Sequence, residues 1–421
     1  MHVKIHPVVS AAEQALSPVF AEIDWRVRVN LAKVLRAFRE QRVGAHHFAG
    51  VSGYGHHDQG REVLDRVFAQ VMGAEAAAVR LQMVSGTHAI ACALFGVLRP
   101  GDELLAVAGS PYDTLEEVIG LRGEGQGSLR DFGIGYRQID LTPTGEVDWE
   151  KLATAIQPQT RLVHIQRSCG YSWRPSLDIH TLARIIALVK AQKPEVICFV
   201  DNCYGEFVET QEPCEVGADL VAGSLIKNPG GTLAPAGGYV AGREELVEAA
   251  ACRLTAPGIG REGGATFDLN RLLFQGLFLA PQMVGEAVKN AHLAAWVFDH
   301  LGYGVMPAPF CPRTDVIQAI QLRSPDKLVA FCRAVQTWSP IDAYVTPVPE
   351  AMPGYADAVV MAGGTFIEGS TLELSADGPM RDPYTVYLQG GSHLSHGALA
   401  ISAVLTALGH CQSTSVINSK I

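Results

Sequence analysis

Apolar residues recur along the first forty positions at steps of three and four, which is the spacing of one face of a helix. The residues that carry this pattern are Leu16, Phe20, Ile23, Val27, Leu31 and Val34. They predict an amphipathic helix over residues 9–40. A loop rich in glycine and histidine follows it and separates this helix from the rest of the chain.

From about residue 58, short apolar runs of strand length alternate with segments of helical periodicity. The predicted strands cover 77–84, 103–108, 136–141 and 161–166, two runs that end at Asp201 and Ser224, and 238–241. The predicted helices cover 59–72, 87–98, 113–120, 148–156 and 179–191. This alternation predicts an α/β fold with a mostly parallel, doubly wound sheet that is covered by helices on both faces. Ligands bind such sheets at the carboxyl ends of the strands.

The pattern changes near residue 300, where short strands punctuated by glycine and proline continue to about residue 389. A strand over 315–322 and a helix over 325–336 are the clearest elements, and they predict a smaller α+β domain. The sequence therefore predicts three parts: an N-terminal helix and loop over 1–57, a large domain over 58–298 and a small C-terminal domain over 299–421.

Composition and charge narrow the class of protein. The chain has 421 residues, 48% of them hydrophobic, and a formal net charge of −10. No block of lysine and arginine is present, which argues against nucleic acid or an anionic membrane as a partner and favours small molecules. Nine cysteines without a Cys-x-x-Cys pair indicate a reducing compartment. The first residues lack the apolar core of a signal peptide and no apolar stretch of membrane length follows, so we expect a cytoplasmic protein.

Asp201 and Lys227 are the most informative polar pair, because each follows a short apolar run and the two runs are neighbours in the chain. At the ends of adjacent parallel strands they would lie together. A carboxylate there can keep the pyridine nitrogen of pyridoxal 5'-phosphate protonated, and a lysine amine can form the Schiff base. Burial and a neighbouring cation would lower the lysine pKa and suit it to act as a general base. Taken singly, Asp201 could be a helix cap and Lys227 an exposed lysine.

A phosphate turn is predicted at Ser85-Gly86-Thr87-His88, which follows a strand and opens an alanine-rich helix. Free backbone N–H groups and the positive end of the helix dipole favour a phosphate at such a place. The same residues would also make a plain helix N-cap. Ser224 could add a hydroxyl to the phosphate, and the ring of Tyr112 could stack on the cofactor or simply cap a turn.

Several of these segments resemble a known family. Residues 85–87, 112–114, 200–202 and 224–227 resemble blocks of the transsulfuration group of fold-type I pyridoxal phosphate enzymes. Residues 53–55, 166–168, 201–207, 373–379 and 389–391 resemble more closely the methionine gamma-lyase-like family of carbon–sulfur lyases associated with aluminium resistance. The resemblance extends from about residue 45 to residue 400.

The resemblance implies a fold-type I homotetramer or dimer whose active sites are shared between subunits. It implies Lys227 as the Schiff-base lysine, Asp201 on the pyridine nitrogen and Tyr112 stacked on the ring, with Tyr112 also placed to act as an acid near the leaving group. It further implies phosphate contacts from Gly86, Thr87 and Ser224, and a phosphate contact from Tyr54 to a neighbouring subunit. Tyr54 could equally belong to a plain surface loop.

The substrate site is less well defined by the sequence. Arg381 is the first candidate for the substrate α-carboxylate and Arg313 the second, because a guanidinium can give a carboxylate two parallel hydrogen bonds. Arg381 could instead form a salt bridge. The segment 168–171 departs from the asparagine-containing turn of transsulfuration enzymes, and Arg167 and Arg174 beside it are further candidates for substrate binding. Arg61 is a weaker phosphate candidate, which could instead pair with Asp65. The histidines of the loop after residue 53 are expected to be solvated, and no metal site is predicted.

These features predict a lyase that eliminates a thiol from a sulfur amino acid and releases a keto acid and ammonia. Elimination at Cβ and at Cγ both fit. An aldolase acting on β-hydroxy amino acids or an aminotransferase would use the same fold and the same Lys–Asp pair. A pyridoxal phosphate-binding protein without turnover, with a role in storage or regulation, is the alternative from another class.

Overall fold

The computed structural model describes residues 5–352 and 355–410, so the outer ends of the first and third predicted parts lie outside the described residues. The chain divides into two compact units. The large unit comprises Val27–Gln282, and the small unit comprises Met1–Arg26 together with Met283–Ile421. The boundaries between them fall within two long helices, α2 (Ser17–Glu40) and α9 (Asn270–His300).

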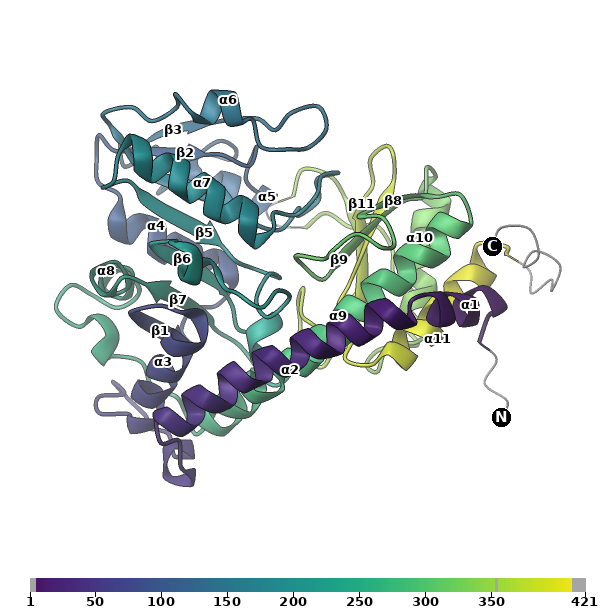
Figure 1. Cartoon of the computed structure of the whole chain (residues 1–421), viewed down its shortest axis with the longest axis horizontal. Coiled ribbons are helices and arrows are strands. Elements are labelled where there is room, and N and C mark those ends of the chain that lie inside the picture. Colours follow the sequence, from purple (N-terminus) through teal and green to yellow (C-terminus); the bar gives the residue numbers. More distant parts are fainter. Residues whose placement is uncertain (1–4, 353–354, 411–421) are drawn as a thin grey trace. The chain divides into compact units, whose positions relative to one another are not determined.

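The large unit is built on a seven-stranded sheet in the order β1-β7-β6-β5-β4-β2-β3 (Figure 1). Its strands are β1 (Ala76–Arg80), β2 (Glu103–Ala106), β3 (Gly135–Gln138), β4 (Thr160–Gln166), β5 (Ile197–Asp201), β6 (Leu220–Ser224) and β7 (Gly238–Gly242). All neighbouring strands are parallel except that β7 runs antiparallel to β1 and β6. The predicted mostly parallel α/β sheet is confirmed.

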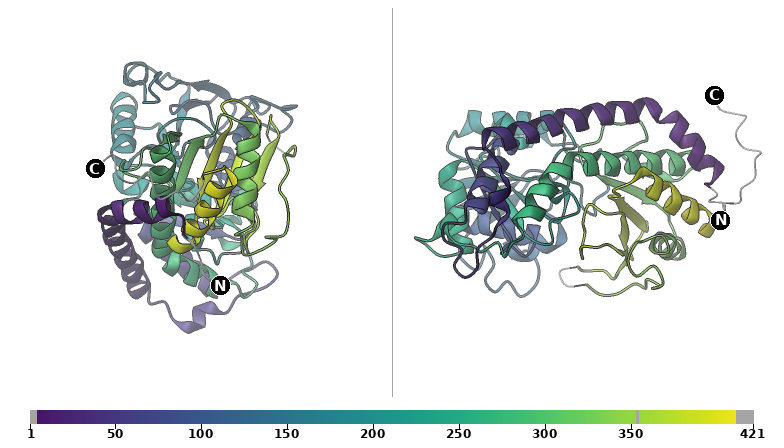
Figure 2. Two further views of the ribbon diagram at one scale, coloured as in Figure 1. Left: turned by 90° about the vertical axis from the view of Figure 1, so that its right-hand side faces the viewer. Right: turned by 90° about the horizontal axis from the view of Figure 1, so that it is seen from below.

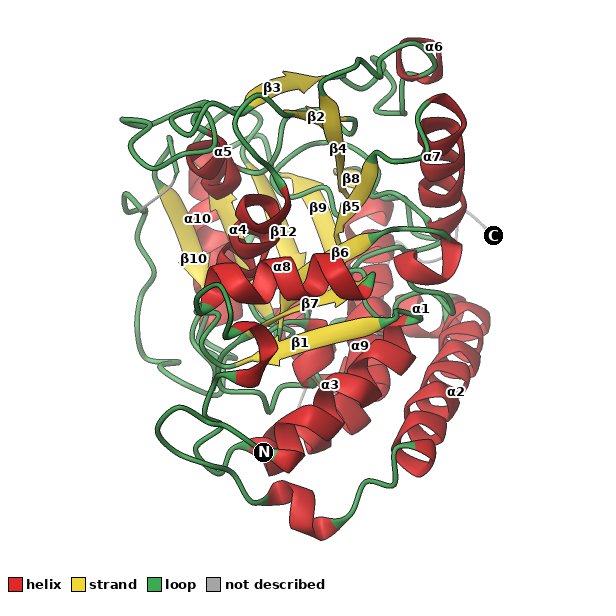
Figure 3. Cartoon of the chain, turned by 90° about the vertical axis from the view of Figure 1, so that its left-hand side faces the viewer, coloured by secondary structure: helices red, strands yellow, loops and turns green. Residues whose placement is uncertain are grey.

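The central strands of this sheet are continuous apolar runs, which need helices packed against them. They are buried along their whole length. The helices of the large unit, besides α2 and α9, are α3 (Gln59–Met72), α4 (Gly86–Val97), α5 (Asp113–Ile119), α6 (Trp149–Leu152), α7 (Ile179–Gln192) and α8 (Glu244–Leu254). α4 and α8 contact each other, and α4 packs on β6 and β7 (Figure 3). None of the described helices is both long enough and apolar enough to cross a membrane.

The small unit contains a five-stranded antiparallel sheet in the order β10-β11-β12-β9-β8. Its strands are β8 (Gly304–Met306), β9 (Ile317–Gln321), β10 (Val359–Ala362), β11 (Ser375–Pro379) and β12 (Thr385–Gln389), and its helices include α1 (Pro7–Ala15), α10 (Pro325–Gln336) and α11 (Leu394–Ala407). α10 and α11 pack side by side (Figure 2). Phe298, Phe331 and Val404 belong to the apolar core of this unit. The predicted α+β character of this region is confirmed.

The N-terminal region differs from the single helix predicted over 9–40. It forms α1 and α2, with a break at Leu16, and Pro18 explains the break because proline has no N–H to donate within a continuous helix. Val9 and Ala12 of α1 lie in the core of the small unit, and the backbone N–H of His6 donates to Ser402 Oγ at 3.1 Å. The helix α1 therefore packs with C-terminal residues of the small unit.

Candidate active site

Asp201 and Lys227 stand at the carboxyl ends of neighbouring parallel strands. β5 ends at Asp201, which is paired with Ala222 of β6, and Lys227 lies three residues beyond the end of β6. Asp201 is buried and Lys227 is half-buried. The backbone N–H of Cys203 donates to Asp201 Oδ1 at 3.1 Å, which fixes the carboxylate at the strand end. The two groups thus meet as predicted from the ends of their apolar runs.

The electrostatics of the pair correct one expectation. Burial raises the pKa of the Asp201 carboxyl, and the Cys203 N–H and the Lys227 charge oppose that effect. Burial by itself would lower the pKa of Lys227, but the surrounding acidic groups, Asp201 among them, outweigh it and raise that pKa. The shift of the Lys227 pKa is opposite to the predicted lowering, because the acidic neighbours of the lysine outweigh its burial.

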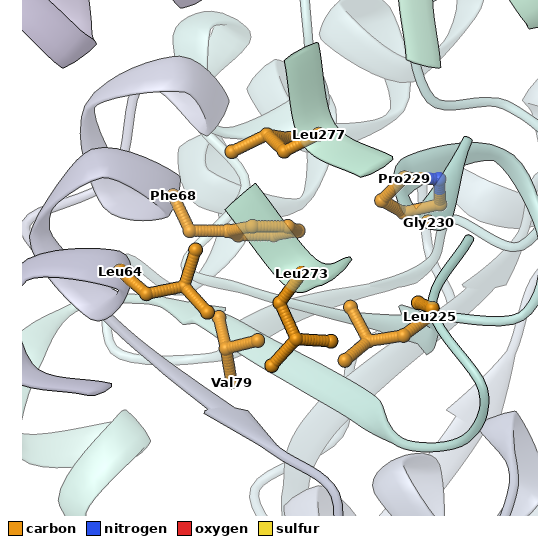
Figure 4. A pocket seen from close by; sticks show the side chains of 9 residues that line it. Leu64, Phe68, Val79, Leu225, Pro229, Gly230, Leu273 and Leu277 are labelled. Atoms are coloured by element: carbon orange, nitrogen blue, oxygen red, sulfur yellow. The ribbon is translucent and has the colours of Figure 1, made fainter. Parts of the chain in front are cut away.

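The turn that carries Lys227 rests on an apolar layer. A small cavity is lined by Leu225 and Pro229 from this turn, by Leu64 and Phe68 from α3, and by Leu273 from α9 (Figure 4). Its lining is apolar, so we assign it to the packing of the turn and not to ligand binding.

The first turn of α4 and the Ser224 side chain form a candidate phosphate site, which we call the cradle. Ser85 caps this helix by accepting a hydrogen bond from the His88 N–H at 3.1 Å, so the predicted N-cap is present. The N–H groups of the first helical turn have no acceptor within the helix. A Cβ on Gly86 would lie 3.2 Å from Ser224 Cβ, so the Ser224 side chain is beside this turn. Ser224 is buried and its Oγ has no partner among the described residues. An anion that accepts from the turn and from Ser224 would satisfy both.

Tyr112 reaches the same cradle from the N-cap position of α5. Its hydroxyl donates to Thr87 Oγ1 at 3.0 Å, and Thr87 Oγ1 lies 3.2 Å from Thr114 Oγ1. Burial and the nearby Asp201 raise the pKa of the Tyr112 phenol, so it is neutral and can donate a proton.

Gln166 holds Tyr112 in place and was not identified from the sequence as a separate site residue. It ends β4 opposite Asp201 in the parallel ladder. Its Oε1 accepts from the Tyr112 N–H at 2.8 Å, and its Nε2 donates to the Ser168 carbonyl at 3.0 Å. A Cβ on Gly170 would lie 3.7 Å from Tyr112 Cβ, so the altered turn at 168–171 packs against the tyrosine.

Arg167 and Arg174, which the sequence offered as substrate ligands, donate within the protein. Buried Arg167 bonds to Asn202 Oδ1 at 2.8 Å and to Glu209 Oε2 at 2.6 Å. Arg174 bonds to the Ser168 carbonyl at 2.6 Å, and also to the carbonyls at 166 and 175. Both arginines hold the turn and the loop after β5 in position.

Glu206 is a buried acid that sequence reasoning did not single out. Its Oε1 accepts from the Tyr239 hydroxyl at 2.7 Å, while its Oε2 has no partner among the described residues. A Cβ on Gly223 would lie 2.7 Å from Glu206 Oε1, so glycine at this point of β6 makes room for the acid. Burial raises the pKa of Glu206 to about 8. In the sequence, Glu206 was marked only by its place in the motif that follows Asp201.

The loop before α3 presents Tyr54 to the surface, with 85% of the residue exposed. Buried Arg61 anchors this loop by donating to the carbonyls of Gly55, Gly264 and Glu262. The alternative pairing of Arg61 with Asp65 is not observed, because Asp65 pairs with Arg80 at 2.8 Å. An exposed tyrosine on an anchored loop can reach another molecule.

The two candidates for the substrate carboxylate, both in the small unit, differ in their surroundings. Arg381 is partly exposed and forms a salt bridge with Asp357 at 3.0 Å. Arg313 is only 1% exposed, and none of its three guanidinium nitrogens has a hydrogen-bond partner among the described residues. Burial lowers the pKa of Arg313 to about 10. The nearby Asp315 charge opposes that effect, but no described residue forms a hydrogen bond with the Arg313 guanidinium, which leaves its N–H groups available to an anionic ligand.

Three groups come together within the large unit: the cradle with the unpartnered Ser224 hydroxyl, the Asp201 carboxylate and the Lys227 amine. They fit the phosphate, the ring nitrogen and the aldehyde carbon of pyridoxal phosphate. The fold and the site define the fold-type I class, and known methionine gamma-lyases and cystathionine gamma-synthases of this class depend on that cofactor.

The chain belongs to the methionine gamma-lyase family, whose model matches residues 5–409. It is 50% identical over 397 residues to the uncharacterized protein YnbB of Bacillus subtilis (strain 168), covering 94% of each chain. A Listeria monocytogenes structure, named as a candidate cystathionine beta-lyase involved in aluminium resistance, superposes with a TM-score of 0.93 at 50% identity and covers 95% of this chain and 99% of that one. A carbon–sulfur lyase involved in aluminium resistance from Clostridium novyi NT gives 0.91 at 46% identity, covering 95% of each.

Proposed function

We propose that this protein is a pyridoxal phosphate-dependent enzyme that eliminates a thiol from a sulfur amino acid, with cystathionine, cysteine or a methionine-like compound as substrate. The observation that carries the proposal is the position of Asp201 and Lys227 at the ends of neighbouring strands, next to the cradle and its unpartnered Ser224 hydroxyl. The family and its carbon–sulfur lyase members support the reaction class.

The residues have distinct parts in this reaction. The bound cofactor supplies an electron sink for the pair left when the substrate Cα loses its proton. Lys227 removes that proton and holds it at Nζ. Asp201 accepts the hydrogen bond of the ring nitrogen and keeps it protonated. Tyr112, a neutral phenol anchored by Thr87, can donate a proton to the leaving sulfur. Loss of the thiol and hydrolysis then give a keto acid and ammonia.

The function is tested by incubating the purified protein, loaded with cofactor, with cystathionine, cysteine, methionine and threonine in turn. We expect pyruvate or 2-oxobutyrate together with a thiol from at least one sulfur substrate, and the identity of the keto acid reports elimination at Cβ or at Cγ. Acetaldehyde from threonine without a keto acid from any sulfur substrate would support an aldolase instead. If the protein binds the cofactor but forms no product from any substrate, the result would support the alternative of a pyridoxal phosphate-binding protein without turnover.

Ser224→Ala is expected to weaken cofactor binding about 10- to 100-fold, because a hydrogen bond to a charged group contributes roughly 1.5–3 kcal/mol. The measurement is the dissociation constant of pyridoxal phosphate, followed by its visible absorbance. Ser128→Ala is the matched control, since Ser128 is a second buried serine of the large unit whose hydroxyl bonds to the Asp131 N–H instead. An unchanged dissociation constant in Ser224→Ala would show that the cradle is not the phosphate site.

Arg313→Leu is expected to raise KM for the amino acid substrate by about 10- to 100-fold, since a paired guanidinium contributes roughly 1.5–3 kcal/mol to anion binding. Arg381→Ala should change KM by less than about threefold, because an exposed ion pair contributes about 0–1 kcal/mol. Both variants are compared by steady-state kinetics with one sulfur substrate. If the large effect falls on Arg381, the assignment is reversed.

We also propose a homo-oligomer, a dimer or a tetramer, in the cytoplasm. The exposed Tyr54 supports shared active sites, in which its hydroxyl would reach the phosphate of a neighbouring subunit. Sedimentation equilibrium of the loaded protein separates the two states, and a stable monomer with full activity would contradict the proposal.

A further inference from the structure

Tyr204 lies against the reactive atom of the site. Lys227 Nζ is 4.0 Å from the centroid of the Tyr204 ring, within the distance at which an ammonium is attracted to the face of an aromatic ring. Tyr204 is buried, with 8% of the residue exposed. Desolvation strengthens this attraction. The contact distinguishes the ammonium form of the lysine from the neutral amine, which the ring face attracts far less.

The backbone of Tyr204 is held in an unfavourable conformation. Its φ is +69°, in the left-handed region that residues other than glycine rarely adopt. The Asn228 side chain stabilises the turn by donating from Nδ2 to the carbonyls of Tyr204 and Glu206, each at 2.9 Å. Asn228 is the residue directly after Lys227 and is fully buried. The same turn therefore carries the amine and fixes the ring that faces it.

The loop has little room to relax. A Cβ on Gly205 would lie 2.5 Å from Arg167 Cδ, so the backbone next to Tyr204 packs directly on a buried arginine. Such strain persists only where surrounding contacts fix the conformation, and it concentrates at functional sites.

We propose that Tyr204 is a positioning residue that holds the protonated Lys227 amine in place during the reaction. This inference rests on the proposed function, in which Lys227 carries the Cα proton at Nζ as an ammonium. Asp201, Cys203 and Tyr112 also face the lysine, and the buried Glu206 contributes to its electrostatic environment. Asp201 would be engaged by the ring nitrogen once the cofactor is bound. The ring of Tyr204 is neutral, so its attraction for the ammonium persists in that state.

The test uses cofactor-free protein and does not depend on turnover. Lys227 is labelled with a small amine reagent at a series of pH values, and the rate at that position is read by peptide mass spectrometry. Only the free amine reacts. At pH values below the lysine pKa, a fall of about one unit in that pKa therefore raises the fraction of free amine, and with it the labelling rate, about tenfold. Tyr204→Phe keeps the ring face and should label at the original rate. Tyr204→Leu should label about tenfold faster, with Lys151 on the surface as the internal control.

A second replacement separates electrostatics from access. Pentafluorophenylalanine at position 204 keeps the shape of the ring but reverses the partial charge of its face, and it should label fastest of all. The proposal is supported if Lys227 labels fastest with pentafluorophenylalanine at position 204, more slowly with leucine, and most slowly, at equal rates, with phenylalanine and tyrosine. A pentafluoro variant that labels at the original rate, or a phenylalanine variant as fast as the leucine one, overturns it. Failure of the lyase assay with this order intact would instead contradict the proposed function alone.

Discussion

Lys227→Ala is expected to lower the rate of keto-acid formation by about 10⁴-fold or more. One side chain is both the covalent anchor of the cofactor and the base that removes the Cα proton, and general-base catalysis by itself contributes roughly 10²–10⁴-fold. The visible absorbance of cofactor bound through the lysine should disappear. Turnover and absorbance are measured on the same cofactor-loaded preparation.

The control for this variant is Lys151→Ala, which removes an exposed lysine paired with Asp148. It should leave both signals unchanged. Removing Lys227 leaves Asp201 buried without its opposite charge, so circular dichroism must show that the variant is folded. A small primary amine added to folded Lys227→Ala should restore part of the rate, because the missing group is an amine. Retention of visible absorbance and of more than about one per cent of the rate would contradict the role of Lys227.

The sequence predicted those parts of the site that depend on local signals. Asp201 and Ser224 end buried apolar runs, and Ser85 opens a helix after a strand, so their positions follow from the periodicity of neighbouring residues. Because parallel strands end at the same edge of a sheet, these local signals also predicted that the groups would meet. The fold class could be predicted for the same reason.

The residues that support this site depend on contacts across the sheet, and no local pattern of residues marks them. Gln166 acts on Tyr112 because β4 lies beside β2, the strand that precedes Tyr112, and Glu206 fits only because Gly223 leaves space on β6. The long helix α9 was not predicted either, since Pro281 interrupts its pattern. The preference for Arg313 over Arg381 required knowledge of which guanidinium is buried without a partner.

Glu206→Gln is expected to stabilise the cofactor-free protein at alkaline pH and to leave it unchanged near pH 5. Burial raises the pKa of Glu206 from its ordinary value of 4.5 to about 8. Between these values the folded protein retains a proton that the unfolded chain has released, so the unfolded state binds fewer protons. The free energy of unfolding therefore falls as pH rises through this window, by about 1.4 kcal/mol per pH unit.

Glutamine resembles the protonated acid, because its amide oxygen can accept from the Tyr239 hydroxyl as Glu206 Oε1 does. It has no proton to lose, so the variant lacks this part of the pH dependence. Urea unfolding of both proteins at one concentration, at each unit from pH 5 to pH 9, should give a difference that grows up to about pH 8 and is then constant. Glu117→Gln, at an exposed position of α5, should show no such divergence. A difference between Glu206→Gln and the original protein that is equal at every pH would show that Glu206 is ionised in the folded state, and that its buried charge is neutralised by a neighbour.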